Sequence, residues 1–211
     1  MKFEPICSQR GYRLNKSKDV KNNQNLGLDI LTQSTEKALM VAKERLSAFL
    51  GLDVTMSVPK IVIPSYSDSE LRFEVGDFER DGVGLIFSGH ARGSSYLLFD
   101  SSNVGDLIAS VTGEDPSGSD FSEIHDDFLK EMGNIVLNGC VGSLSNEMNG
   151  KLEFEVPKLC SGKIEDFTKN GFKGNDQEIC FVGIGLFNID KLGISGSISF
   201  MFYFDDVDDI T

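Results

Sequence analysis

Four polar residues recur at intervals of three or four along one predicted helix, and they are the residues best suited to chemistry in this chain. Asp127, Glu131, Asn134 and Asn138 fall on one side of the helix, because positions three or four apart share a face. Asparagine is a poor helix former, so two of them in mid-helix favour a functional stripe over an ordinary solvated face. A carboxylate can anchor a cationic partner group, and a carboxamide can hold a water molecule by donating and accepting at once. Since an amide does not titrate, this pair suits an electrophile that is already activated, as in phosphoryl transfer.

The helix that must position this stripe is expected from about Asp120 to Met148, followed by Asn149-Gly150 as its stop. Glu123 stands where it would complete a capping box with the first residue. The side opposite the stripe is apolar and is expected to be the buried face. Its members are Phe128, Leu129, Met132, Ile135, Val136, Gly139 and Cys140.

The order of predicted elements occurs twice along the chain. A helix expected over 29–50 leads to a strand that ends Val58-Pro59-Lys60, and Val156-Pro157-Lys158 follows the second helix 98 residues later. The remaining strand-like segments are mostly hairpin-like, which favours antiparallel pairing. They cover 53–58, 71–75, 82–87, 95–99, 151–156, 178–187 and 193–204, with a short helix over 102–111. The pattern predicts an α+β fold, in which a pseudo-twofold duplicated helix–strand unit forms one largely antiparallel sheet with long helices packed on it.

The stripe also fits a known spacing. Asp127-x3-Glu131-x2-Asn134-x22-Pro157 resembles the signature of the CheC/CheX/FliY family of chemotaxis phosphatases, and the segment 131–139 is similar to the helix of that family. The resemblance covers 29–205, as a single CheC-like domain with a first repeat at 29–112 and a second at 120–205.

The resemblance implies removal of phosphate from the aspartyl phosphate of a CheY-like response regulator. It makes Glu131 the carboxylate that docks on a receiver lysine and Asn134 the amide that orients the attacking water. Asp127 and Asn138 are candidates for contact with the partner, and Pro157, like Pro59 in the first repeat, belongs to the structural part of the motif. The Mg²⁺ is expected in the receiver, so no cofactor or metal of the chain's own is implied.

The first repeat departs from the signature. The same register gives Asp29-x3-Gln33-x2-Glu36-x22-Pro59, with Gln33 in place of the glutamate and Glu36 in place of the asparagine. A carboxylate cannot donate a hydrogen bond to water, and its charge repels an acyl phosphate. We therefore expect the first site to be degenerate. This loss keeps open an alternative function, namely a non-catalytic module, related to flagellar switch proteins, that binds a receiver domain or a CheD-like deamidase.

Charge limits the classes of partner. The 211 residues include 20 basic and 33 acidic ones, a net charge of −13. Nucleic acids and anionic membranes are bound by clustered lysine and arginine, so neither is expected as a partner. The surplus is uneven, because residues 1–28 form a polar basic segment, expected to be a mobile arm, and 206–211 an acidic tail. No signal peptide or membrane helix is recognisable and the four cysteines lack metal-site spacing, which predicts a cytoplasmic protein.

Overall fold

The computed structural model describes residues 18–57, 60–62, 79–148, 150–163, 167 and 179–204. Its framework is an eight-stranded sheet in the order β1-β7-β8-β4-β3-β5, with β2 also on β7 and β6 also on β3. The strands are β1 (Thr55–Met56), β2 (Lys60–Val62), β3 (Arg80–Gly89), β4 (Arg92–Asp100), β5 (Leu152–Phe154), β6 (Lys158–Gly162), β7 (Ile179–Ile189) and β8 (Ile194–Phe204). The helices are α1 (Lys18–Leu50), α3 (Ser101–Thr112) and α4 (Phe121–Glu147).

The sheet is built from two hairpins that meet at its centre. The hairpin β3–β4 belongs to the first repeat and the hairpin β7–β8 to the second, and β4 pairs with β8 between them, with Tyr96 opposite Ser199. The short strands that follow α1 pair with β7, and those that follow α4 pair with β3. All of these pairings are antiparallel. Each repeat therefore adds its short strands to the hairpin of the other, and the predicted pseudo-twofold, largely antiparallel α+β fold is confirmed.

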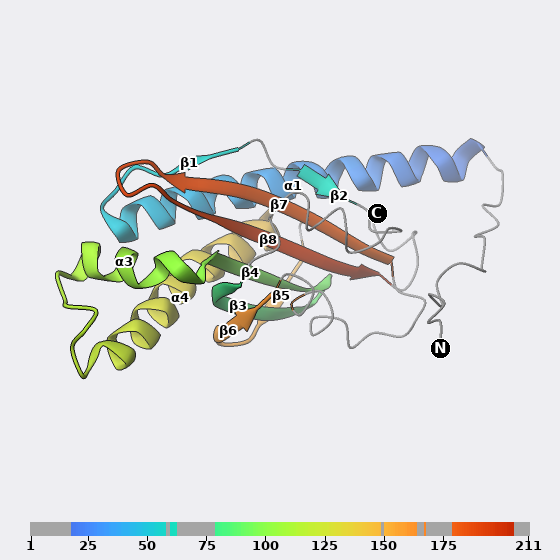
Figure 1. Ribbon diagram of the computed structural model, residues 1–211. Helices are drawn as coiled ribbons and strands as arrows, with labels where there is room; N and C mark the ends of the chain where they lie inside the picture. The colour runs from blue at the N-terminus through green and yellow to red at the C-terminus, as the bar shows by residue number, and fades with distance from the viewer. Residues whose placement is uncertain are drawn as a thin grey trace, which may run out of the picture.

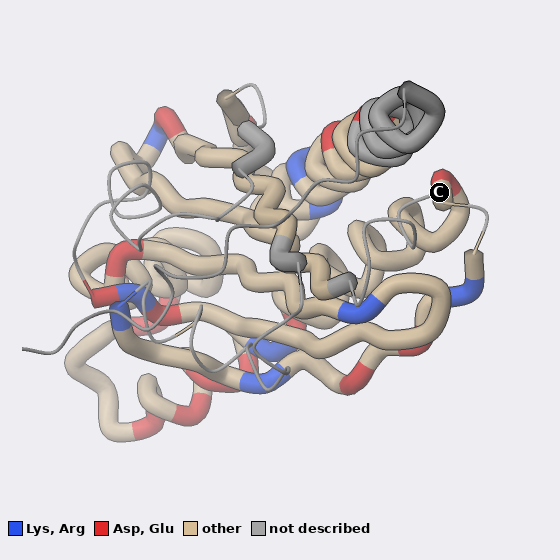
Figure 2. Tube along the Cα trace, turned by 90° about the vertical axis from the view of Figure 1, so that its right-hand side faces the viewer, with Lys and Arg blue, Asp and Glu red and all other residues tan. Residues whose placement is uncertain are grey.

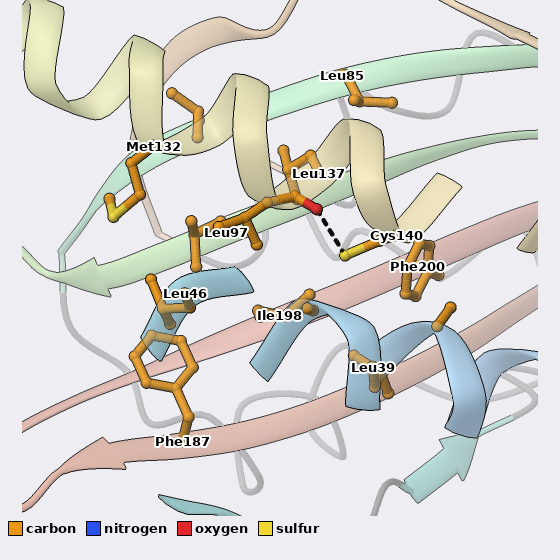
Figure 3. Close-up of a cluster of buried hydrophobic side chains, with 14 of the residues drawn as sticks. Leu39, Leu46, Leu85, Leu97, Met132, Leu137, Cys140, Phe187, Ile198 and Phe200 are labelled. Atoms are coloured by element: carbon orange, nitrogen blue, oxygen red, sulfur yellow. Dashed lines mark hydrogen bonds between the residues drawn. The ribbon is translucent and has the colours of Figure 1, made fainter. Parts of the chain in front are cut away.

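Each long helix likewise packs on the hairpin of the other repeat. The first-repeat helix α1 lies over β7 and β8, and the second-repeat helix α4 lies over β3 and β4, with the two helices also in contact with each other (Figure 1). Side chains from both helices and from the central strands interdigitate in one core (Figure 3). Phe99 and Phe187, one from each hairpin, meet there with ring centroids 5.4 Å apart. Among the residues that the structure describes, the buried clusters draw on both repeats, and neither repeat has a core of its own.

Glycine allows close approach at one point in each helix–sheet contact. A Cβ atom on Gly133 of α4 would lie 2.3 Å from Cγ2 of Val83 on β3. In the other helix–sheet contact, Thr35 of α1 meets Gly183 of β7, and a Cβ atom on Gly183 would lie 2.3 Å from Cγ2 of Thr35. Real carbon–carbon contacts require about 3.5 Å or more. The missing side chain at Gly133 therefore sets how closely α4 lies on the sheet.

The connection from the sheet to α4 begins at a capped helix. The Asp100 carboxylate accepts hydrogen bonds from the backbone N–H of Ser102 at 3.0 Å and from its Oγ at 2.6 Å. These bonds, led by the one from the Ser102 side chain, lower the pKa of Asp100 below its usual value. At the other end, Gly113 adopts the left-handed conformation, with φ of 79°, and closes α3 with a hydrogen bond to Ala109. A short loop from there leads to α4.

Several expected boundaries differ from the structure. Helix α1 begins at Lys18, so residues 18–28, expected as part of an arm, are helical. Once a helix is nucleated by a packed segment, each further residue adds a hydrogen bond at little cost, even in a polar sequence. The expected capping box is wrong as well, because Asp120 has helical backbone angles and its side chain caps nothing. The expected strand 53–58 shortens to Thr55–Met56.

A β-bulge explains a further difference near Pro157. Phe154 pairs with Phe87 and Lys158 pairs with Gly84, so three residues of this strand oppose two of β3. The expected strand 151–156 is therefore interrupted after Phe154, and Leu152 is buried whereas Phe154 and Val156 are exposed. Pro157 lies buried in the bulge, where no ladder hydrogen bond is required of its nitrogen.

Some expectations fall outside the described residues. They are the structure of residues 1–17, Pro59 of the first motif, the strand over 71–75 and the acidic tail 206–211.

Candidate functional site

The structure brings the predicted polar residues together on the outer side of α4. Asp127, Glu131 and Asn134 are exposed, and Asn138 is half-buried at the end of the same stripe. The opposite side fixes the helix on the sheet and is fully buried at eight positions. These are Leu129, Met132, Gly133, Val136, Leu137, Cys140, Val141 and Leu144. Of the expected buried face, Phe128, Ile135 and Gly139 prove to be only half-buried, because they flank the contact instead of facing the strands.

The two asparagines of the stripe are joined directly. Nδ2 of Asn138 donates a hydrogen bond to Oδ1 of Asn134 at 2.6 Å. Their spacing of four residues permits this contact, but its direction depends on the tertiary environment and was not predictable. Asp127 lies 3.6 Å from Nζ of Lys130, and both side chains are exposed. Such a surface pair contributes little to stability, so Asp127 is available to a partner.

A shallow groove of about 450 Å³ adjoins Glu131 at the beginning of α4. Its apolar wall contains Phe49 of α1 and Phe128 of α4, whose ring centroids lie 5.2 Å apart. Four carboxylates line it, from Asp120, Glu123, Asp127 and Glu131. A groove with this charge repels a free phosphate and attracts a cationic group. The contribution of Phe49 comes from a residue more than 70 positions away along the chain, which no local pattern could reveal.

The degenerate first motif lies elsewhere. On α1, Gln33 is exposed and Glu36 is half-buried. The neighbouring Lys37 forms an ion pair with Glu147 at the C-terminal end of α4, whereas Phe49, near the C-terminal end of α1, meets Phe128 near the beginning of α4. The two helices are therefore antiparallel, and the two motifs lie toward opposite ends of the helix pair. The structure does not bring Gln33 or Glu36 to the Glu131–Asn134 site.

Other chemistry finds little support in the described ranges. They contain no group of three or more His, Cys, Asp or Glu side chains placed to hold a metal ion. Burial, assisted by the nearby Asp81, raises the pKa of the Cys160 thiol to about 12, and burial also raises the pKa of Cys140. A thiolate nucleophile needs a lowered pKa, so neither cysteine is suited to nucleophilic catalysis.

The charged residues and the helices add two further observations. Lysine and arginine are dispersed among aspartate and glutamate along the described trace (Figure 2). Among the helices that the structure describes, none combines the length and apolarity needed to cross a membrane.

Comparison with known proteins places this arrangement in context. No model of a protein family matches the sequence. A protein of Halobacterium salinarum named "Putative CheY-P phosphatase CheC1" is 21% identical over 156 residues, which cover 74% of this chain and 79% of that protein. Several solved structures share the fold, among them the following two.

The first of these structures is FliY of Thermotoga maritima, with a TM-score of 0.57 at 16% identity over 93% of this chain and 96% of that chain. The second is a chain of the CheX–CheY–BeF3–Mg²⁺ complex from Borrelia burgdorferi, with a TM-score of 0.52 at 17% identity over 78% of this chain and 94% of that chain. The sequence match and the shared architecture confirm the resemblance to the CheC/CheX/FliY family of chemotaxis proteins, and this chain has the fold of that family.

Proposed function

We propose that the chain is a phosphatase for the aspartyl phosphate of a CheY-like receiver domain. The observation that carries the proposal is the exposed pair Glu131 and Asn134, one turn apart on a helix whose other side is locked onto the sheet. Rigid placement matters because positioning supplies most of the catalysis in phosphoryl transfer. The relationship to the Halobacterium protein and the receiver complex formed by a structural neighbour support this choice of substrate.

The residues divide the work between docking and hydrolysis. Glu131, beside the acidic groove, pairs with a lysine of the receiver and sets the distance between the two proteins. Asn134 holds a water molecule in line with the phosphorus atom, accepting through Oδ1 and donating through Nδ2. The water oxygen bonds to phosphorus, the bond from phosphorus to the aspartyl oxygen breaks, and aspartate and inorganic phosphate are released. The acyl phosphate is activated by the receiver and its Mg²⁺, so the phosphatase needs no base.

The test is phosphate release from a phosphorylated receiver at several phosphatase and receiver concentrations. Wild type is expected to accelerate release at least tenfold over spontaneous hydrolysis. Glu131→Gln keeps the shape of the side chain but removes its charge, and we expect KM to rise about tenfold with a smaller change in kcat. Glu44→Gln, on the exposed side of α1, is the matched control and should behave as wild type. Release no faster than spontaneous hydrolysis with wild-type protein rules out the proposed activity.

One observation favours a second candidate function at the first motif. The exposed Gln33 is flanked on α1 by Ile30 and Met40, which are 43% and 53% exposed. Two exposed apolar side chains beside a motif that lacks the catalytic residues suit binding, in line with a module that docks a receiver or a CheD-like deamidase. Under that alternative, wild type binds a partner without accelerating phosphate release.

The two motifs are expected to differ sharply in activity. Gln33→Ala and Glu36→Ala should leave kcat and KM for the receiver within about twofold of wild type, because neither side chain reaches the Glu131–Asn134 site. The measurement is the same phosphate-release assay. A loss of more than about tenfold in either variant would show that the first motif participates in turnover.

A further inference from the structure

We infer that Asn138 is a positioning residue that fixes the direction in which the Asn134 carboxamide faces; this inference rests on the proposed function. The starting point is the hydrogen bond from Nδ2 of Asn138 to Oδ1 of Asn134, at 2.6 Å. Asn134 is exposed and Asn138 is half-buried. Asn134, the residue that would contact the water, is therefore hydrogen-bonded to Asn138, whose half-buried side chain has less freedom to move.

The direction of this bond determines what Asn134 can offer. A carboxamide has a two-fold, broad preference about its last torsion, so an exposed asparagine readily exchanges its oxygen and nitrogen positions. Because Asn138 donates this bond, the group that faces it must be a hydrogen-bond acceptor, which in Asn134 is the carboxamide oxygen. If the Asn134 amide turned by half a circle, two NH2 groups would face each other. The bond thus directs both N–H groups of Asn134 away from Asn138 and leaves one lone pair of Oδ1 free for water.

The surroundings of Asn138 indicate that this residue serves function and not stability. Its Oδ1 is buried and has no hydrogen-bond partner within the described residues. An unpartnered buried carbonyl destabilises the folded state, and asparagine is a poor choice for the interior of a helix. A residue retained only for packing would be apolar or alanine. Removing Asn138 should therefore raise stability while lowering activity, a combination that a packing role does not produce.

The experiment compares kcat, KM and the melting temperature of wild type, Asn138→Ala and Asn138→Asp. For Asn138→Ala we expect kcat about tenfold lower, KM within about twofold, and a melting temperature equal to or above that of wild type. For Asn138→Asp we expect a larger loss of kcat, because the carboxylate accepts from Nδ2 of Asn134 and turns the amide round. KM of the Asp variant should also rise through repulsion by the acidic receiver pocket, so kcat is the quantity compared. Asn146→Ala, at an exposed position of α4, is the matched control and should retain wild-type activity.

The possible results separate this inference from the proposed function. If wild type is active and Asn138→Ala keeps its kcat, or if Asn138→Asp is the milder variant, Asn138 does not position Asn134 and the phosphatase assignment stands. A melting temperature that falls together with kcat in Asn138→Ala assigns the residue to packing and also overturns the inference. A wild-type protein that does not accelerate phosphate release overturns the proposed function first, and the inference with it.

Discussion

Replacing Asn134 with alanine is expected to lower kcat for receiver dephosphorylation by about 100-fold or more, with KM nearly unchanged. The side chain is exposed on α4 and forms a hydrogen bond with Asn138, so its removal takes away the group proposed to hold the water and little else. Alanine is the stronger helix former, so the folded state should be as stable as wild type or slightly more stable. The loss would therefore be one of transition-state positioning and not of folding.

Asn134→Asp sharpens this expectation, because it preserves the shape of the side chain. A carboxylate cannot donate to water, and its charge opposes the approach of a phosphoryl group, so we expect a loss at least as large as with alanine. The same residue type, an acid, occupies this place in the first motif as Glu36. Steady-state phosphate release at several concentrations of phosphorylated receiver, each in excess over the phosphatase, measures kcat and KM separately, and Asn146→Ala is the control on the same helix. Full activity of Asn134→Ala would show that another group holds the water.

Replacing Gly133 with alanine is expected to destabilise the protein by about 1–3 kcal/mol, the usual cost of overpacking a buried contact. The new Cβ atom would lie 2.3 Å from Cγ2 of Val83, so α4 must move away from β3 directly beside Asn134. Gly142→Ala is the matched control, because it lies in the same helix with no heavy atom within 4 Å of its Cβ position. It should stabilise by about 0.5–1 kcal/mol, since alanine is the better helix former.

Urea unfolding at equilibrium measures both glycine variants. Val83→Ala combined with Gly133→Ala removes the clashing methyl groups and should recover part of the loss, which a double-mutant cycle would report as coupling between the two positions. We also expect Gly133→Ala to lower kcat even where it is folded, because Asn134 moves with the helix backbone. Equal shifts in stability for Gly133→Ala and Gly142→Ala would contradict the close helix–strand contact.

The sequence predicted best what local periodicity controls. The second long helix was expected over 120–148 and is found at Phe121–Glu147, and the exposed side with Asp127, Glu131 and Asn134 was identified correctly. The four long strands were also expected close to their observed positions. An amphipathic helix and an alternating strand can both be recognised from the spacing of their apolar residues, because each must bury one side.

Features set by distant residues were missed. The bulge before Pro157 depends on register against β3, and the groove beside Glu131 depends on Phe49 from the other long helix. The hydrogen bond between Asn134 and Asn138 was also missed, because spacing brings the two side chains together but does not decide which of them donates. The start of α1 was missed for a different reason, since helix propagation into a polar segment leaves no amphipathic pattern to read.

The crossed placement of the two long helices makes the first repeat a structural part of the site proposed on the second. The inner side of α1 covers β7 and β8, and α4, which carries Glu131 and Asn134, lies on β3 and β4 from the first repeat. A fragment that begins at residue 120 would keep both site residues but lose the strands beneath them and the helix that shields its own hairpin. Substitutions at the exposed Gln33 and the half-buried Glu36 are expected to leave that covering intact. The first repeat thus supports the proposed site on the second through its strands and its helix, whatever the chemistry of its own motif.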